Sequence, residues 1–328
     1  MKKKFFKLFY LFYFLFLISL LVYIFSYASI INKKVYDLFW IKSIQNRLYY
    51  AGIIKKFPCY KYDAELGYVP KKGICEWDNV EFNISLEFNN FFRKNNNRNI
   101  DTDNSLTPIA ILGDSFTMGW GVNDQETYSA ILEKQLQRKV LNFGVAGYGT
   151  EQEILRFLKS PYYSSVKKVI IQYCFNDLQS NIELELRNGN FEKNYITEKL
   201  IKNNDLSRIE KSLFAIRYFK SSFRLFYKDL KSFFSKTTKP DFSSHEYKFL
   251  EILEKYNFLD NKEIIVFYVN DRGLEFDNYL EKKFKNIHFI KVDLNKKKNF
   301  FILDSHLNSV GHLDLASQLF DVIKKKNW

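Results

Sequence analysis

From residue 107 onward, short apolar runs alternate with stretches of helical spacing, and this alternation restricts the fold more than any other feature. The apolar runs cover residues 108–112, 139–143, 168–173, 264–269 and 287–292. Helical patterns lie at residues 126–136, 151–158 and 310–325. Apolar strands that alternate with helices indicate a parallel sheet covered on both faces. The sequence therefore predicts a three-layer α/β/α domain with a mostly parallel sheet.

Three residues lie just after three of these predicted strands. Ser115 comes after the first strand, Gly147 after the second and Asn176 after the third. In open parallel sheets, ligands bind beyond the carboxyl ends of the strands. We therefore expect the three residues to meet at one edge of the sheet.

The rest of the chain divides into regions of different composition. Residues 1–32 are predicted to form a membrane anchor, residues 33–106 an irregular N-terminal region, and residues 107–328 the α/β domain. Within that domain, residues 182–258 are basic, aromatic and helical in pattern, which favours an inserted cap or docking element.

The N-terminus carries an uncharged run at residues 8–31 that is long enough to span a bilayer. Lys2, Lys3, Lys4 and Lys7 precede it, so the positive-inside rule keeps the N-terminus in the cytoplasm. The expected location is thus the cytoplasmic membrane, with a single pass and an extracytoplasmic body. A cleavable signal peptide is the alternative, because small residues around Ala28 offer a cleavage site.

The net charge limits which classes of partner the chain can bind. The net charge of +13 permits nucleic acid, an anionic membrane surface or an acidic polysaccharide. Lysine is scattered through nearly every segment and no zinc-finger spacing occurs, so we expect no nucleic-acid partner.

Cys59 and Cys75 are close enough in sequence to pair in an oxidising compartment. We predict that disulfide.

Ser115 is the first candidate nucleophile, because it lies between a predicted strand and a predicted helix. A serine hydroxyl needs a base to remove its proton and fixed donors around the oxyanion that forms. The sequence around it is Gly113-Asp114-Ser115-Phe116-Thr117. Thr117 stands where a Gly-x-Ser-x-Gly elbow has its second glycine, which disfavours an α/β-hydrolase.

Four ordered segments instead resemble the four sequence blocks of the SGNH (GDSL-like) hydrolase family: residues 111–117, 142–150, 175–177 and 304–308. The resemblance implies a flavodoxin-like sheet, with Ser115 as nucleophile, His306 as general base and Asp304 as its orienting carboxylate. It also implies an oxyanion hole made of the N–H groups of Ser115 and Gly147 and the side-chain amide of Asn176.

The residues themselves agree with these roles. Glycine at position 147 lets the backbone approach a substrate closely, and Asn176 offers a neutral donor. Of the four histidines, His306 is predicted to lie in a loop beside a carboxylate, whereas His245, His288 and His312 fall in the insertion, a strand and the terminal helix region. His312 is kept as an alternative base.

The spacing Asp304-x-His306 departs from most of the family, in which the aspartate lies three residues before the histidine. Some membrane-anchored relatives share the shorter spacing. Residues two apart project to the same side of extended backbone, so a direct contact is possible but strained. The alternative is that Asp304 caps a loop. Asp114 and Asp177 are predicted to brace turns through backbone N–H groups.

The resulting hypothesis is a serine esterase that removes or transfers an acyl group, acetyl in the first instance, on a cell-surface glycan or lipid. An O-acyltransferase differs only in the acceptor of the acyl group, and the sequence leaves that choice open. A non-catalytic, membrane-tethered glycan-binding or assembly factor is the alternative from another class. Neither a cofactor nor a metal is implied, and the sequence does not indicate an oligomeric state.

Overall fold

The structure, a computed structural model, describes residues 2–31, 58–78, 81–97, 103, 105–187, 191–196, 243–258, 260–269, 284–301 and 304–328. The chain divides into two compact units. One comprises Met1–Ile54 with Asn204–Lys239, and the other comprises Lys55–Asn203 with Pro240–Trp328.

In the first unit, the described part is the helix α1 (Lys2–Ile31). Large apolar side chains along it are exposed, such as Phe9, Phe12 and Phe16. Over the residues that the structure describes, no helix combines the length and the apolar character that crossing a membrane requires. The transmembrane anchor over residues 8–31 stays a prediction.

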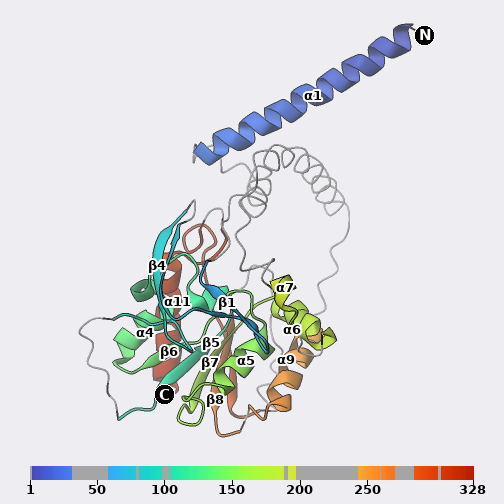
Figure 1. Ribbon diagram of the computed structural model, residues 1–328. Coiled ribbons are helices and arrows are strands. Elements are labelled where there is room, and N and C mark those ends of the chain that lie inside the picture. Colours follow the sequence, from blue (N-terminus) through green and yellow to red (C-terminus); the bar gives the residue numbers. More distant parts are fainter. Residues whose placement is uncertain are drawn as a thin grey trace. The chain divides into compact units, whose positions relative to one another are not determined.

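The second unit is built on a five-stranded parallel sheet, as the sequence predicted (Figure 1). Its strands run in the order β6-β5-β7-β8-β9, the flavodoxin-like arrangement. They are β5 (Ile109–Leu112), β6 (Val140–Asn142), β7 (Lys168–Tyr173), β8 (Glu263–Tyr268) and β9 (Ile287–Lys291). Because β6, β5 and β7 are neighbours, the loops that follow them emerge side by side.

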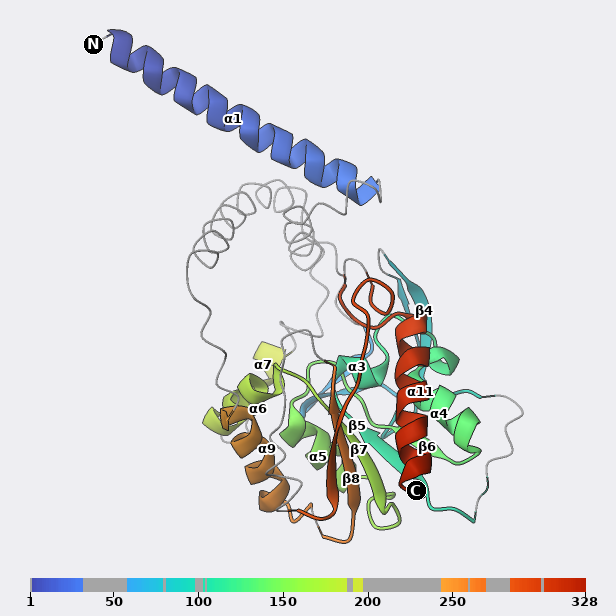
Figure 2. The same cartoon turned by 180° about the vertical axis from the view of Figure 1, so that it is seen from behind.

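Helices cover both faces of this sheet, which gives three layers (Figures 1 and 2). On one face, α4 (Tyr128–Leu136) and α11 (Ser309–Lys325) pack against Ile109 and Ile111. On the other, α5 (Thr150–Leu158) and α9 (Ser243–Lys255) pack against Ala110 and Leu112. The alternation along β5 thus puts successive side chains into two separate cores, both closed to water.

The region expected to be irregular, residues 33–106, contains two antiparallel hairpins, so that expectation is wrong for its described part. The first hairpin pairs β1 (Tyr60–Asp63) with β2 (Gly67–Pro70), and the second pairs β3 (Gly73–Asp78) with β4 (Asn83–Phe88). Both lie in the same compact unit as the parallel sheet. Residues 33–57 are outside the described residues.

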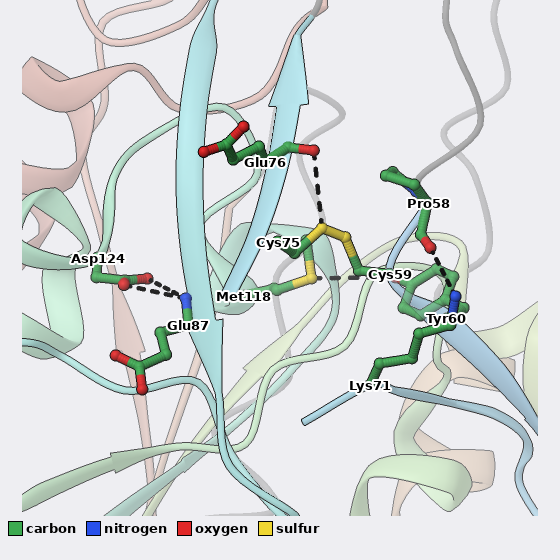
Figure 3. Close-up of a disulfide and its surroundings, with 9 residues drawn as sticks. All are labelled: Pro58, Cys59, Tyr60, Lys71, Cys75, Glu76, Glu87, Met118 and Asp124. Atoms are coloured by element: carbon green, nitrogen blue, oxygen red, sulfur yellow. Dashed lines mark hydrogen bonds between the residues drawn. A yellow bond between two sulfur atoms is a disulfide. The ribbon is translucent and has the colours of Figure 1, made fainter. Parts of the chain in front are cut away.

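A disulfide between Cys59 and Cys75 joins the two hairpins, as predicted (Figure 3). Their Cα atoms are 6.0 Å apart, inside the range that a disulfide spans. The first hairpin is therefore fastened covalently to the strand that follows it.

The predicted insertion at residues 182–258 is described only at its two ends. At its start lie α6 (Asp177–Leu186) and the short α7 (Lys193–Ile196). At its end, Phe249, Ile252 and Leu253 of α9 are buried in the core of the sheet. This end is thus a layer of the α/β domain. Residues 197–242 lie outside the described residues, and with them most of the predicted cap.

Candidate active site

Ser115 begins the short helix α3 (Ser115–Met118), three residues after the last residue of β5. Asp114 caps this helix, because its Oδ1 accepts the Phe116 N–H at 2.9 Å. The predicted bracing role of Asp114 is therefore confirmed. Ser115 is 9% exposed, so this residue is almost fully buried in the turn.

His306 reaches Ser115 from the loop that precedes α11. The distance between Ser115 Oγ and His306 Nε2 is 2.8 Å, a normal hydrogen bond. The imidazole ring packs against two aromatic rings, with centroid distances of 4.9 Å to Phe116 and 5.3 Å to Trp120. These two contacts restrict the rotation of the ring and so favour the direction of Nε2 toward the hydroxyl.

Asp304 contacts the other nitrogen of His306, so the shortened spacing does allow the pair to form. The residue between them, Ser305, has a φ of +64°. This left-handed conformation is uncommon for a residue with a side chain. It turns the backbone so that both neighbours face the same point. The Asp304 N–H donates to Glu81 Oε2 at 2.8 Å, which fixes the carboxylate's own backbone.

Trp120 is a site residue that sequence reasoning missed. Its Nε1–H donates to Asp304 Oδ2 at 3.0 Å, while Asp304 Oδ1 contacts His306. Trp77 of β3 packs against the Trp120 ring at a centroid distance of 4.2 Å. The indole therefore orients the carboxylate and also stacks on the imidazole. Its position five residues after Ser115 was the available signal.

Arg93 fastens the loop that follows α3, and sequence reasoning missed it as well. Its guanidinium, 1% exposed, donates to the carbonyls of Met118, Gly119 and Val122 at 2.7 to 2.8 Å. Nε donates to Asp124 Oδ1 at 2.7 Å. These bonds hold the loop that carries Trp120. Arg93 itself precedes residue 107, where the α/β domain predicted from the sequence begins.

The three predicted oxyanion donors follow β5, β6 and β7, which are adjacent in the sheet. Gly147 lies in the turn after β6, and its φ of +84° favours glycine. Asn176 is exposed at the N-terminus of α6. Within the described residues, no backbone carbonyl accepts from the N–H of Ser115 or Gly147. Their grouping at one edge fits the expectation, and their role stays a prediction.

Gly144 determines how closely the loop of Gly147 approaches the nucleophile. A Cβ atom at position 144 would lie 2.2 Å from the backbone nitrogen of Met118. Backbone there is not free to yield, so glycine is required at this position for the loop to pack on α3. The close approach places the loop beside the helix that begins with Ser115.

His312 does not serve the site. It is fully buried, its Nδ1 accepts the Tyr128 N–H at 3.2 Å, and its ring stacks on that tyrosine. Burial, followed by the charges of Arg93 and His306, lowers the pKa of His312 to about 3. The neutral ring is therefore a packing residue of α11.

Asp177 behaves as predicted for a bracing residue, since its Oδ2 accepts the Cys174 N–H at 3.1 Å. Burial raises the pKa of both Asp177 and Asp114 above the ordinary range. Among the described residues, no cluster of three or more His, Cys, Asp or Glu side chains could hold a metal ion. The chemistry that the described site can perform is nucleophilic attack by an activated serine.

A family model described as "GDSL-like Lipase/Acylhydrolase family" matches residues 111–217. The matched stretch contains Ser115, Gly147 and Asn176, while His306 and Asp304 lie beyond it. The match covers about a third of the chain, and this stretch is similar to that family. None of the curated proteins matches the chain significantly.

Solved structures similar to the chain include a protein described as lipolytic, of the G-D-S-L family, from Desulfitobacterium hafniense (15% identity, 66% of this chain, 99% of that one, TM-score 0.39). A family two carbohydrate esterase from Clostridium thermocellum has 14% identity, 67% and 63% coverage, and a TM-score of 0.35. A GDSL-like lipase from Bacteroides thetaiotaomicron has 12% identity, 69% and 92% coverage, and a TM-score of 0.35. These scores are low, so the fold rests on the sheet topology given above.

Proposed function

We propose that this chain is a GDSL-like carboxylic ester hydrolase that forms an acyl-enzyme on Ser115. The observation that carries the proposal is the hydrogen-bonded series from Ser115 Oγ to His306 Nε2, at 2.8 Å, and from His306 Nδ1 to Asp304. This is the arrangement that a serine needs to lose its proton as it attacks. The proposal rests on geometry and on the family match together.

In the proposed reaction, His306 Nε2 takes the Ser115 proton as Oγ attacks the ester carbonyl carbon. The oxyanion that forms is stabilised by the N–H groups of Ser115 and Gly147 and by the Asn176 amide. The carbon–oxygen bond to the alcohol then breaks, and His306 returns the proton to the departing oxygen. Water then attacks the acyl carbon while His306 takes one of its protons. The bond from the acyl carbon to Ser115 Oγ breaks, and His306 returns the proton to Oγ, which releases the acid and restores the serine.

The proposed substrate is an acyl ester, acetyl in the first instance, of a cell-surface glycan or lipid. The net charge of +13 supports an anionic polymer or lipid as the carrier, because it raises the local concentration of such a substrate. The proposed location is the outer side of the cytoplasmic membrane, and the uncharged run at residues 8–31 supports it. Extraction of membranes with alkaline carbonate tests this location, and release of the chain into the soluble fraction would contradict it.

The activity is tested by initial rates with 4-nitrophenyl acetate, butyrate and octanoate, using the full chain in detergent. We expect saturable hydrolysis that favours acetate, and loss of kcat by about 10⁵-fold or more in Ser115→Ala. Equal rates for the wild type and Ser115→Ala, with matched melting temperatures, would contradict an enzyme at this site.

The acceptor of the acyl group is tested on the acyl-enzyme itself. Faster decay of an acetyl-enzyme with an added glycan than in water would assign a transferase, and equal decay would assign a hydrolase. If Ser115→Ala restored wild-type function in cells completely, a non-catalytic glycan-binding or assembly factor would be the correct interpretation.

A further inference from the structure

Two buried tyrosines of the first hairpin converge on one carbonyl in the loop that carries Gly147. The hydroxyl of Tyr68 donates to Ala146 O at 2.9 Å, and that of Tyr60 donates to the same oxygen at 3.2 Å. Their rings pack together with centroids 4.7 Å apart. The side chains are 4% and 5% exposed for Tyr60 and Tyr68, so water is excluded from this contact.

The carbonyl that they hold belongs to the central peptide of a β-turn. The Tyr148 N–H donates to Val145 O at 3.2 Å, which closes a turn with Ala146 and Gly147 at its centre. The φ of +84° at Gly147 fits a type II turn. Types I and II differ chiefly in the direction of this central peptide, so a flip of one peptide interconverts them.

The direction of this peptide decides where the Gly147 N–H points. In a trans peptide, the carbonyl and the following N–H point in opposite directions, and no described peptide bond is cis. With the Ala146 carbonyl held against the hairpin, the Gly147 N–H is directed away from it. A side chain at position 147 would also collide with the Tyr68 hydroxyl, at 2.7 Å from a Cβ.

We propose that Tyr60 and Tyr68 are positioning residues for ester hydrolysis: by holding the Ala146 carbonyl, they keep the Gly147 N–H directed at the oxyanion. This inference rests on the proposed function, since it needs Gly147 to serve as an oxyanion donor. Neither tyrosine touches the reacting atoms. Both lie outside residues 107–328, in the hairpin that precedes the predicted catalytic domain.

The hairpin is fastened at several points, which gives the tyrosines a fixed base. The disulfide of Cys59 lies next to Tyr60 in the chain, and the Tyr60 hydroxyl is 4.0 Å from the sulfur of Met118 on α3 (Figure 3). Burial raises the pKa of both tyrosine hydroxyls well above the ordinary value. They therefore keep their protons and act as donors throughout the pH range of the folded chain.

The test compares Tyr60→Phe, Tyr68→Phe and the double variant in the full chain, with kcat and KM measured for 4-nitrophenyl acetate. Loss of a fixed oxyanion donor costs about 10²–10³ in kcat, so we expect the double variant to lose about 10- to 100-fold, with KM changed less than about threefold. The affinity for phenylboronic acid, which forms a tetrahedral adduct with the serine, is expected to fall in parallel with kcat/KM.

Tyr148→Phe is the matched control. The Tyr148 hydroxyl donates to the carbonyl of Tyr68, so this variant removes a buried hydroxyl between the same hairpin and loop while leaving the Ala146 carbonyl bonded. We expect its kcat to stay within about threefold of the wild type, while its melting temperature falls as much as that of the single variants.

An unchanged kcat in the double variant, or an equal loss in Tyr148→Phe, would overturn the positioning role. Loss through KM alone would overturn it too, because misdirection of an oxyanion donor acts on the transition state. If the wild type were no faster than Ser115→Ala, both the proposed function and this inference would fail. An active wild type with an unaffected double variant would remove this inference alone.

Discussion

Replacing Asp304 with asparagine is expected to abolish most ester hydrolysis because of the direction that the new amide must take. In the structure, Trp120 Nε1–H donates to Asp304 Oδ2 at 3.0 Å, and the other oxygen contacts His306 Nδ1. A carboxylate accepts from both donors, whereas an asparagine has one accepting oxygen and one donating amino group. One of the two contacts must therefore change.

The indole decides which contact is kept. Its nitrogen can only donate, so the amide oxygen faces Trp120 and the amino group faces His306. The imidazole then accepts at Nδ1 and carries its proton on Nε2, where it cannot take the proton of Ser115. A wrong tautomer of this kind lowers kcat by about 10⁴, equivalent to about 5 kcal/mol of transition-state stabilisation.

Removing the indole donor should release the amide. In Trp120→Phe/Asp304→Asn, the amide can turn its oxygen to His306, so we expect kcat at least about tenfold above that of Asp304→Asn. Trp120→Phe alone is expected to lower kcat. The same substitution is therefore expected to lower kcat in the wild type and to raise it in Asp304→Asn. The assay is kcat for 4-nitrophenyl acetate, measured for the wild type and the three variants at the same pH. A double variant slower than Asp304→Asn would refute this reasoning.

Three further outcomes are expected. Arg93→Met leaves the Asp124 carboxylate buried without the Arg93 guanidinium. The free energy of unfolding, measured in urea, should therefore fall by about 3–5 kcal/mol. A loss below about 1 kcal/mol would contradict the role given to Arg93. Because burial lowers the pKa of His312 to about 3, the folded chain excludes a proton that the unfolded chain binds below about pH 6.5, and stability is lost as the pH falls through that window. His312→Asn keeps an acceptor for the Tyr128 N–H. Between pH 4.5 and 6, this variant should reduce the slope of the unfolding free energy against pH by about 1.4 kcal/mol per pH unit. Equal slopes for the variant and the wild type would contradict a neutral His312. Gly144→Ala must push its loop off Met118, so kcat should fall by more than about tenfold at retained secondary structure by circular dichroism, and wild-type kinetics would show that the approach is unnecessary.

The parallel sheet could be predicted because each of its strands is a continuous apolar run that ends at a polar or glycine-containing turn. The β4 strand had a weaker signal, the alternation of buried Ile84, Leu86 and Phe88 with polar residues. Four-residue strands such as β1 give no reliable period, so the first hairpin, together with Tyr60 and Tyr68, was not found.

The contact between Trp120 and Asp304 was out of reach for a different reason. The two residues are 184 positions apart, and no local pattern reports such a pairing. The contact of Asp304 with His306 depends on the left-handed backbone conformation of Ser305. This conformation is uncommon for serine, and nothing in the sequence indicates it. The residue types of the site were therefore predictable, whereas the groups that hold them in place were not.

The nucleophilic role of Ser115 is tested by covalent labelling of the full chain in detergent with a fluorophosphonate, read by intact mass and peptide mapping. A single adduct on Ser115, absent in Ser115→Ala and slowed by at least about 10³-fold in His306→Ala, is the expected result. No adduct on a chain shown to be folded, or an adduct on Ser115 that forms equally fast without His306, would contradict an activated serine at this site.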